Sequence, residues 1–162
     1  MLNKKINVGL GEVKTATNPH MLVTPPVGSC VVVMLYDELM GIGSMAHIML
    51  PDINMAKAKN NRARFANTAV EIMLKEMIDL GAVRRRIKAK IAGGANMFPN
   101  VNRNSELHIG LRNVVAVKGE LKKRKIRLVA EDTEGNYGRC VEFFLETGVV
   151  RTKSALHGNR EI

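Results

Sequence analysis

The sequence predicts a single α/β domain over residues 1–162. A chain of 162 residues of which 46% are hydrophobic is long and apolar enough to bury one core. Short segments that are apolar, or that alternate between apolar and polar residues, indicate strands, and two longer segments with helical spacing lie among them. No internal repeat, low-complexity tract or linker divides the chain.

The first half of the chain predicts mainly strands. The run at 30–36 is β-branched and almost entirely apolar, which is typical of a strand buried on both faces. The polar segment 52–64 has no apolar period, and we expect a mobile surface loop there. Further strands are predicted at 6–11 and 44–50, with a short extended piece at 21–24. Turn residues separate these segments: Asn18-Pro19, Pro25-Pro26, the loop 37–43 and Pro51.

From residue 65 onward the sequence predicts two helices and four strands. Apolar residues recur at helical spacing over 65–80, and Gly81 is placed to end that helix. A second helix is expected over 110–125, with its lysines at the end where the helix dipole favours cations. The strands are expected at 87–92, 126–131, 139–146 and 149–153. We expect 126–131 and 139–146 to pair through the turn 132–136, and the tail from 154 to be frayed.

The net charge of +10 permits an anionic partner of several kinds. Four Phe, two Tyr and no Trp provide few stacking platforms, so we expect no nucleic-acid partner and interpret the basic clusters at 84–90 and 118–127 as a solvated face. The longest apolar run, 30–36, is far shorter than the ~20 residues of a membrane-spanning helix. With no signal peptide in view, we expect a cytoplasmic protein without membrane insertion.

The sequence contains no motif for a metal or a nucleotide. Two cysteines do not make a disulfide framework, and neither CxxC nor zinc-ligand spacing is present. The stretch Gly93-Gly94-Ala95 lacks the remaining residues of both phosphate-binding glycine motifs, so we assign it a close backbone approach at a strand end. No cofactor is expected.

A cysteine and a histidine form the candidate site. Cys30 follows Gly28-Ser29 at the start of one predicted strand, and His47 lies 17 residues later in the next. If the two strands pair, the thiol and the imidazole meet at one end of the sheet, where His⁺ would lower the thiol pKa and yield a reactive thiolate. Successive backbone N–H groups at Gly28 and Ser29 would line an anion pocket beside Cys30.

The alternative interpretation is that both residues are inert. A cysteine beside branched apolar residues is usually a core residue, and a histidine inside an apolar strand is usually a satisfied one. Cys140 lies mid-strand without a glycine turn or a nearby histidine, and serves as the control thiol. Thr24 is unremarkable by itself.

Several segments together resemble the CheD family of chemoreceptor glutamine deamidases, over about residues 8–153. The family's Leu-Gly-Ser-Cys is Val-Gly-Ser-Cys here, and the loop 52–64 departs most from the family pattern. The segments that carry the resemblance are Val27-Gly28-Ser29-Cys30-Val31, Met45-Ala46-His47-Ile48-Met49-Leu50-Pro51, Ala89-Lys90-Ile91-Ala92-Gly93-Gly94-Ala95-Asn96-Met97-Phe98, Ile109-Gly110-Leu111-Arg112-Asn113 and Glu131-Asp132-Thr133.

This resemblance implies a layered sandwich of mixed β-sheets flanked by helices. It implies Cys30 as nucleophile, His47 as acid and base, and Thr24 as the third catalytic residue. The implied substrates are glutamine side chains, with methylated glutamates as a second class, on the cytoplasmic helices of chemotaxis receptors. The implied partner is the phosphatase CheC. A non-catalytic adaptor that binds receptors or CheC remains the alternative function.

Overall fold

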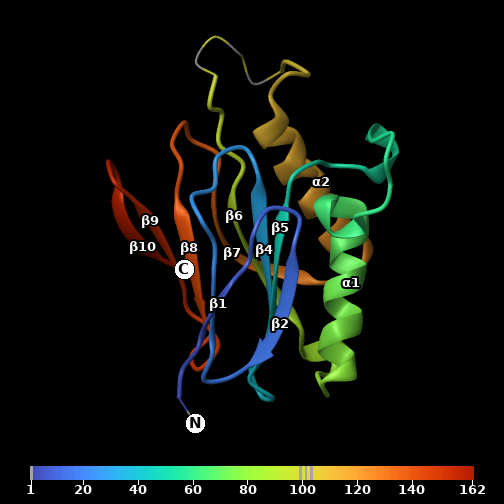
Figure 1. The fold of residues 1–162 in the computed structure, drawn as a ribbon, viewed down its shortest axis with the longest axis vertical. Coiled ribbons are helices and arrows are strands. Elements are labelled where there is room, and N and C mark those ends of the chain that lie inside the picture. Colours follow the sequence, from blue (N-terminus) through green and yellow to red (C-terminus); the bar gives the residue numbers. More distant parts are fainter. Residues whose placement is uncertain (1, 99, 101, 103) are drawn as a thin grey trace.

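The computed structural model describes residues 2–98, 100, 102 and 104–162, and it arranges the chain in three layers (Figure 1). Two five-stranded sheets pack face to face, and two helices cover the far side of one of them. This architecture confirms the predicted sandwich of mixed sheets, with the helices on a single side. No helix among the described residues has the length and apolar character needed to cross a membrane.

The central sheet lies between the helices and the other sheet. Its strand order is β2-β5-β4-β6-β7, and only the pair β6–β7 is parallel, so the sheet is mixed. A parallel pair requires a crossover connection, which here is helix α2. The strands are β2 (Val13–Thr17), β4 (Val31–Asp37), β5 (Ile42–Ile48), β6 (Lys88–Gly93) and β7 (Arg127–Thr133).

The outer sheet has the order β1-β3-β8-β9-β10, and only β1 and β3 run parallel. Its inner face shares a core with the central sheet, which includes Leu22, Val32, Met45 and Phe143. The strands are β1 (Lys5–Asn7), β3 (Met21–Val23), β8 (Cys140–Phe144), β9 (Val150–Ser154) and β10 (Gly158–Glu161).

Helices α1 (Ala66–Asp79) and α2 (Ile109–Lys123) begin and end within two residues of the predicted bounds. Each buries one apolar stripe, such as Val70, Met73 and Met77 of α1, against the central sheet. Three single helical turns, η1 (Ile53–Met55), η2 (Arg62–Arg64) and η3 (Arg84–Arg86), complete the described elements.

Strand β4 lies in the middle of the central sheet and confirms the expectation of burial on both faces. Val31, Val33 and Leu35 face the helices, whereas Val32 and Met34 face the outer sheet. All five are at most 1% exposed. Because β4 pairs with β5 on one edge and β6 on the other, none of its backbone lies at a sheet edge.

The predicted pairing of 126–131 with 139–146 is wrong. Strand β7 pairs with β6 in the central sheet, whereas β8 pairs with β3 and β9 in the outer sheet. The connection between them crosses from one sheet to the other. The buried ion pair Arg139–Asp132, with an N–O distance of 3.1 Å, joins the two sides of this crossing, because Asp132 is the second-last residue of β7 and Arg139 directly precedes β8.

The predicted frayed tail is also wrong, because Ser154 ends β9 and the chain then turns into β10. Ile162 and Val150 exchange two backbone hydrogen bonds of 2.9 and 3.1 Å. Hydrophobicity does not reveal β10, whose residues are all exposed. Pairing with the neighbouring strand orders this segment instead.

Three smaller expectations from the first half need correction. The strand predicted at 6–11 ends at Asn7, and β2, an edge strand with three polar residues, was not predicted. Ile42 and Gly43 belong to β5 and not to the loop. The segment 52–64 contains the turns η1 and η2, and the second N–H group of each turn donates to the side chain of the residue before the turn, Asp52 or Asn61.

Candidate active site

Cys30 lies in a bend directly before β4, where the sequence placed it. Its side chain is partly buried and packs against the core between the two sheets. Gly28 and Ser29 belong to the same bend, and each of their carbonyl oxygens accepts a hydrogen bond from a residue outside it. The N–H of Ala95 donates to Gly28 at 3.0 Å. The side-chain amide of Asn113 donates to Ser29 at 3.1 Å.

His47 lies in β5 and is 1% exposed. Its Nδ1 is 3.3 Å from the carbonyl oxygen of Val8. Because a carbonyl only accepts, Nδ1 carries the proton of the neutral ring, and Nε2 keeps a lone pair. Nε2 is buried and has no hydrogen-bond partner in the described part of the chain. A buried histidine with one free basic nitrogen is not a fully satisfied core residue.

The register of the two strands places the thiol and the imidazole on one face. Val32 of β4 lies opposite His47 of β5, and Cys30 is two residues before Val32. Residues two apart on a strand share a face, and diagonal neighbours across two strands have Cα atoms roughly 7–8 Å apart. Cys30 and Val32 pack in the same core between the sheets, which confirms that they share this face. The predicted meeting of Cys30 and His47 at one sheet end is therefore supported by the register, although no hydrogen bond joins Nε2 to the thiol.

Thr24 follows β3 in the outer sheet and is 7% exposed. Its hydroxyl oxygen accepts a hydrogen bond of 3.1 Å from the N–H of Val141. Val8 links this region to His47, because its N–H donates to Val23 and its carbonyl oxygen lies at the imidazole. Thr24 thus lies beside the backbone that holds the ring, while the group that contacts the ring nitrogen is the carbonyl of Val8.

The two glycines at the end of β6, Gly93 and Gly94, pack directly on the cysteine bend, as expected for a close backbone approach. The N–H of Gly94 donates to the carbonyl oxygen of Cys30 at 2.8 Å. A Cβ at Gly93 would lie 2.4 Å from that same oxygen, so a side chain does not fit there. Gly93 and Gly94 also have φ angles of 104° and 69°, which glycine adopts without strain.

Sequence reasoning assigned no role to Asn113 of α2, which is fully buried. Its side-chain amide donates one hydrogen bond to Ser29 and one, of 3.0 Å, to the carbonyl oxygen of Met49. Ser29 and Met49 lie just beyond the paired ends of β4 and β5, where the ladder has stopped. The two N–H groups of Asn113 therefore bind together the strand ends that carry Cys30 and His47. A polar residue on the buried stripe of a helix is the signal that could have identified it.

Burial makes the resting pair neutral. It raises the pKa of the Cys30 thiol, and the backbone N–H of Cys30 offsets part of this effect. It lowers the pKa of His47, partly offset by the carbonyl of Val8 and the charge of Glu12. These directions favour a neutral thiol and a neutral imidazole at rest, rather than the imidazolium expected from the sequence to lower the thiol pKa. A neutral thiol beside a neutral imidazole is the arrangement of a nucleophile with a general base.

Comparison with known proteins identifies the family of the chain. The family described as "CheD chemotactic sensory transduction" matches residues 49–154. A probable chemoreceptor glutamine deamidase CheD from Syntrophomonas wolfei is 44% identical over 161 residues, which cover 99% of this chain and 100% of the relative. The chain belongs to the CheD family.

Further CheD relatives match along nearly the whole chain. The chemoreceptor glutamine deamidase CheD of Halalkalibacterium halodurans is 41% identical over 162 residues, which cover 99% of this chain and 100% of the relative. A probable chemoreceptor glutamine deamidase CheD of the archaeon Thermococcus kodakarensis is 42% identical, covering 95% of both chains. The family resemblance noted in the sequence is thereby confirmed.

The role of Asn113 generates a first prediction. Asn113→Ala removes two buried hydrogen bonds and should lower the free energy of unfolding by about 2–3 kcal/mol. Asn113→Asp should be at least as harmful, because a carboxylate of the same shape would face two carbonyl oxygens. Urea unfolding measures both. The matched control is Asn159→Ala on exposed β10, which should not change the midpoint. If Asn113→Asp were as stable as the unchanged chain, the amide would not bind these strand ends.

The neutral resting pair generates a second prediction, on pH. Because the pKa of Cys30 is raised, its thiolate fraction at neutral pH is smaller than that of a free cysteine. In a Cys140→Ala background, the rate of alkylation by iodoacetamide should rise about tenfold per pH unit and level off only above the midpoint of N-acetylcysteine amide. A plateau below pH 7 would show a preformed thiolate–imidazolium pair and contradict the neutral one.

Proposed function

We propose that this CheD-family chain is a cysteine-dependent protein-glutamine deamidase that converts glutamine side chains of chemotaxis receptors to glutamate and ammonia. The observation that carries the proposal is the buried His47, whose free Nε2 lies on the same sheet face as the Cys30 thiol. The names of the relatives, chemoreceptor glutamine deamidases, supply the substrate class. Since the implied receptor helices are cytoplasmic, we place the reaction in the cytoplasm.

In the first half-reaction the thiol of Cys30 attacks the carboxamide carbon of the substrate. Nε2 of His47 takes the thiol proton as the S–C bond forms, which compensates for the raised pKa of the thiol. Backbone N–H groups stabilise the negative charge that develops on the carboxamide oxygen. In the described part of the chain, the backbone N–H groups of Ser29 and Cys30 donate to no other residue, so they are available to bind this charge. Protonated His47 then gives its proton to the nitrogen, the C–N bond breaks, and ammonia leaves.

In the second half-reaction a water molecule attacks the thioester. His47 takes one water proton as the new C–O bond forms, and returns it to the sulfur as the S–C bond breaks. The balance is one glutamine and one water consumed, one glutamate and one ammonia released. The enzyme ends with the neutral thiol and neutral imidazole with which it began. A methylated glutamate would form the same acyl-enzyme with methanol as the leaving group, so we propose methylesterase activity as a second reaction of the site.

The remaining site residues position these groups. We assign Thr24 the task of restraining His47 through the backbone. Its hydroxyl accepts the N–H of Val141, and the adjoining Val23 accepts from Val8, whose carbonyl oxygen lies at the imidazole. Gly28 and Ser29 shape the oxyanion pocket, because the bonds from Ala95 and Asn113 to their carbonyl oxygens fix the orientation of the bend. A neutral hydroxyl restrains an imidazole more weakly than an aspartate does.

The third prediction separates the proposed roles by the size of their effects. Cys30→Ala removes the atom that forms the acyl-enzyme, and ammonia release should fall to background. Cys30→Ser should be almost as inactive because its hydroxyl has a much higher pKa. His47→Ala should cost several orders of magnitude. Thr24→Ala should cost roughly ten- to a hundredfold. The measurement is the initial rate of ammonia release from a receptor, with intact mass recording a gain of ~1 Da per deamidation.

Cys140→Ala is the matched control and should keep the full rate, since Cys140 lies in β8 of the outer sheet. Circular dichroism verifies that each variant is folded. Full activity in folded Cys30→Ala would contradict the proposal, and an unchanged chain with no activity on any receptor would favour the adaptor function instead. If the Thr24→Ala variant were as inactive as the His47→Ala variant, the purely restraining role of Thr24 would be contradicted.

A complex with CheC is our fourth prediction, and the family resemblance is its support. A surface that receives a receptor helix is a natural place for a regulator to bind. Titration calorimetry with the CheC of the same genome should give saturable heat with a dissociation constant of tens of micromolar or lower. The folded Cys30→Ala variant should bind equally well, because binding requires no chemistry. Absence of heat at that concentration would contradict the partnership.

A further inference from the structure

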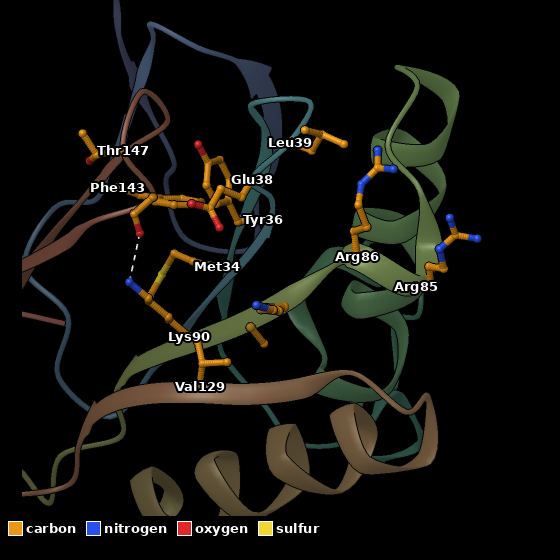
Figure 2. Close-up of a pocket in the computed structure, with 13 residues that line it drawn as sticks. Met34, Tyr36, Glu38, Leu39, Arg85, Arg86, Lys90, Val129, Phe143 and Thr147 are labelled. Atoms are coloured by element: carbon orange, nitrogen blue, oxygen red, sulfur yellow. Dashed lines mark hydrogen bonds between the residues drawn. The ribbon is translucent and has the colours of Figure 1, made fainter.

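A cavity of about 780 Å³ opens between the two sheets at a distance from Cys30 (Figure 2). Strands β4, β6, β7 and β8 supply its walls, together with η3 and the turns after β4 and β8. On β4 it is lined by Met34 and Tyr36, whereas Cys30 precedes the strand. At about 3.3 Å per residue, Met34 lies roughly 13 Å along the chain from Cys30. We call this space the inter-sheet cavity and treat it as separate from the candidate active site.

Positive charge dominates its lining. Arg85, Arg86, Lys88 and Lys90 line the cavity together with a single carboxylate, that of Glu38. The charge of Arg86 is already balanced, because its guanidinium forms a bidentate ion pair with the buried carboxylate of Asp37 at the end of β4. Both N–O distances are 3.0 Å. Neither Arg85 nor Lys88 has a side-chain hydrogen bond or ion pair to another described residue. Arg85 and Lys88 therefore lie at the cavity without a partner in the described part of the chain, together with the one carboxylate of Glu38.

Lys90 is the most constrained of these cations, because its side chain is only partly exposed. Its ammonium donates to the carbonyl oxygens of Gly148 at 3.0 Å and Ile162 at 2.7 Å. The third N–H of this ammonium has no acceptor among the described residues. Burial lowers the pKa of this lysine. An anion in the cavity would accept this third N–H.

The rest of the lining is apolar. Met34 and Phe143, each 1% exposed, lie on the two facing sheets. Val129 and Leu39 are 43% and 76% exposed and lie at the rim. Figure 2 shows Lys90 between Met34 and Val129, with Phe143 and Glu38 across the cavity. Apolar walls with a few convergent polar groups are typical of small-molecule sites, whose volumes are about 300–1,000 Å³.

We propose that the inter-sheet cavity binds a small organic anion. Its carboxylate or phosphate lies on the ammonium groups of Lys88 and Lys90, and its apolar part packs against Met34, Val129 and Phe143. The proposal does not depend on the deamidase reaction, because none of these residues belongs to the candidate active site.

Four probes test the two parts of the proposed ligand. 2-Naphthoate and 2-naphthyl phosphate carry an apolar body with either anionic head. 2-Naphthylmethanol has the body without the charge, and inorganic phosphate has the charge without the body. Both naphthyl anions should bind the full chain and shift the backbone amide resonances of β6 and of the turn after β8, while those of residues 28–30 stay in place. The alcohol and inorganic phosphate should each bind at least about tenfold more weakly.

Variants locate the site. Lys90→Met and Lys88→Gln should each weaken binding of 2-naphthoate about tenfold, and added salt should weaken it further. Lys14→Gln, which removes the same charge from exposed β2, is the matched control and should leave affinity unchanged. Lys88 is exposed, so Lys88→Gln folds even if Lys90→Met does not. Three outcomes would overturn the proposal: no binding of either anion, unchanged affinity in Lys88→Gln, or alcohol binding as tightly as naphthoate.

Discussion

The candidate site depends on the register of β4 against its two neighbours. β4 pairs with β5 so that Val32 lies opposite His47, and with β6 so that Val31 lies opposite Gly93. Since side chains alternate across a strand, a slip of one residue on either edge would move His47 or the glycine turn to the wrong side of Cys30. Because residues 31–35 are apolar on both faces, they do not distinguish one register from the next, whereas the ion pair of buried Asp37 with Arg86 at the far end of β4 does.

Two groups from distant parts of the chain then complete the site. Asn113 contacts Ser29 across 84 residues of sequence, and the carbonyl of Val8 contacts His47 across 39. Neither group is chemically reactive. The amide of Asn113 satisfies backbone oxygens where the β-ladder ends, and the carbonyl of Val8 selects the ring tautomer that leaves Nε2 basic. Cys30 and His47 are thus positioned by hydrogen bonds whose other partners are backbone carbonyl oxygens.

The elements near Cys30 could be predicted because their signals are local. An apolar β-branched run, a glycine bend and a second strand 17 residues later are enough to expect β4, β5 and the Cys30–His47 pair. The proposed role of Thr24 rests on family resemblance alone, since nothing in its sequence neighbourhood marks it. The pairing of β7 with β8 was predicted wrongly because two adjacent strands joined by a turn look like a hairpin, and local sequence does not specify which sheet each joins. Asn113 required the fold, because its two acceptors are backbone atoms.

The distance in sequence between Cys30 and Asn113 has a consequence for the chain during its synthesis. Cys30 and His47 leave the ribosome together and can form their hairpin early, because local contacts form sooner than distant ones. Helix α2 is made more than 60 residues later, and Asn113 contacts Met49 across 64 residues. Until then the two strand ends are not joined and the imidazole has no fixed position relative to the thiol. A nascent chain that ends before α2 therefore holds Cys30 and His47 without the amide that binds their strand ends together.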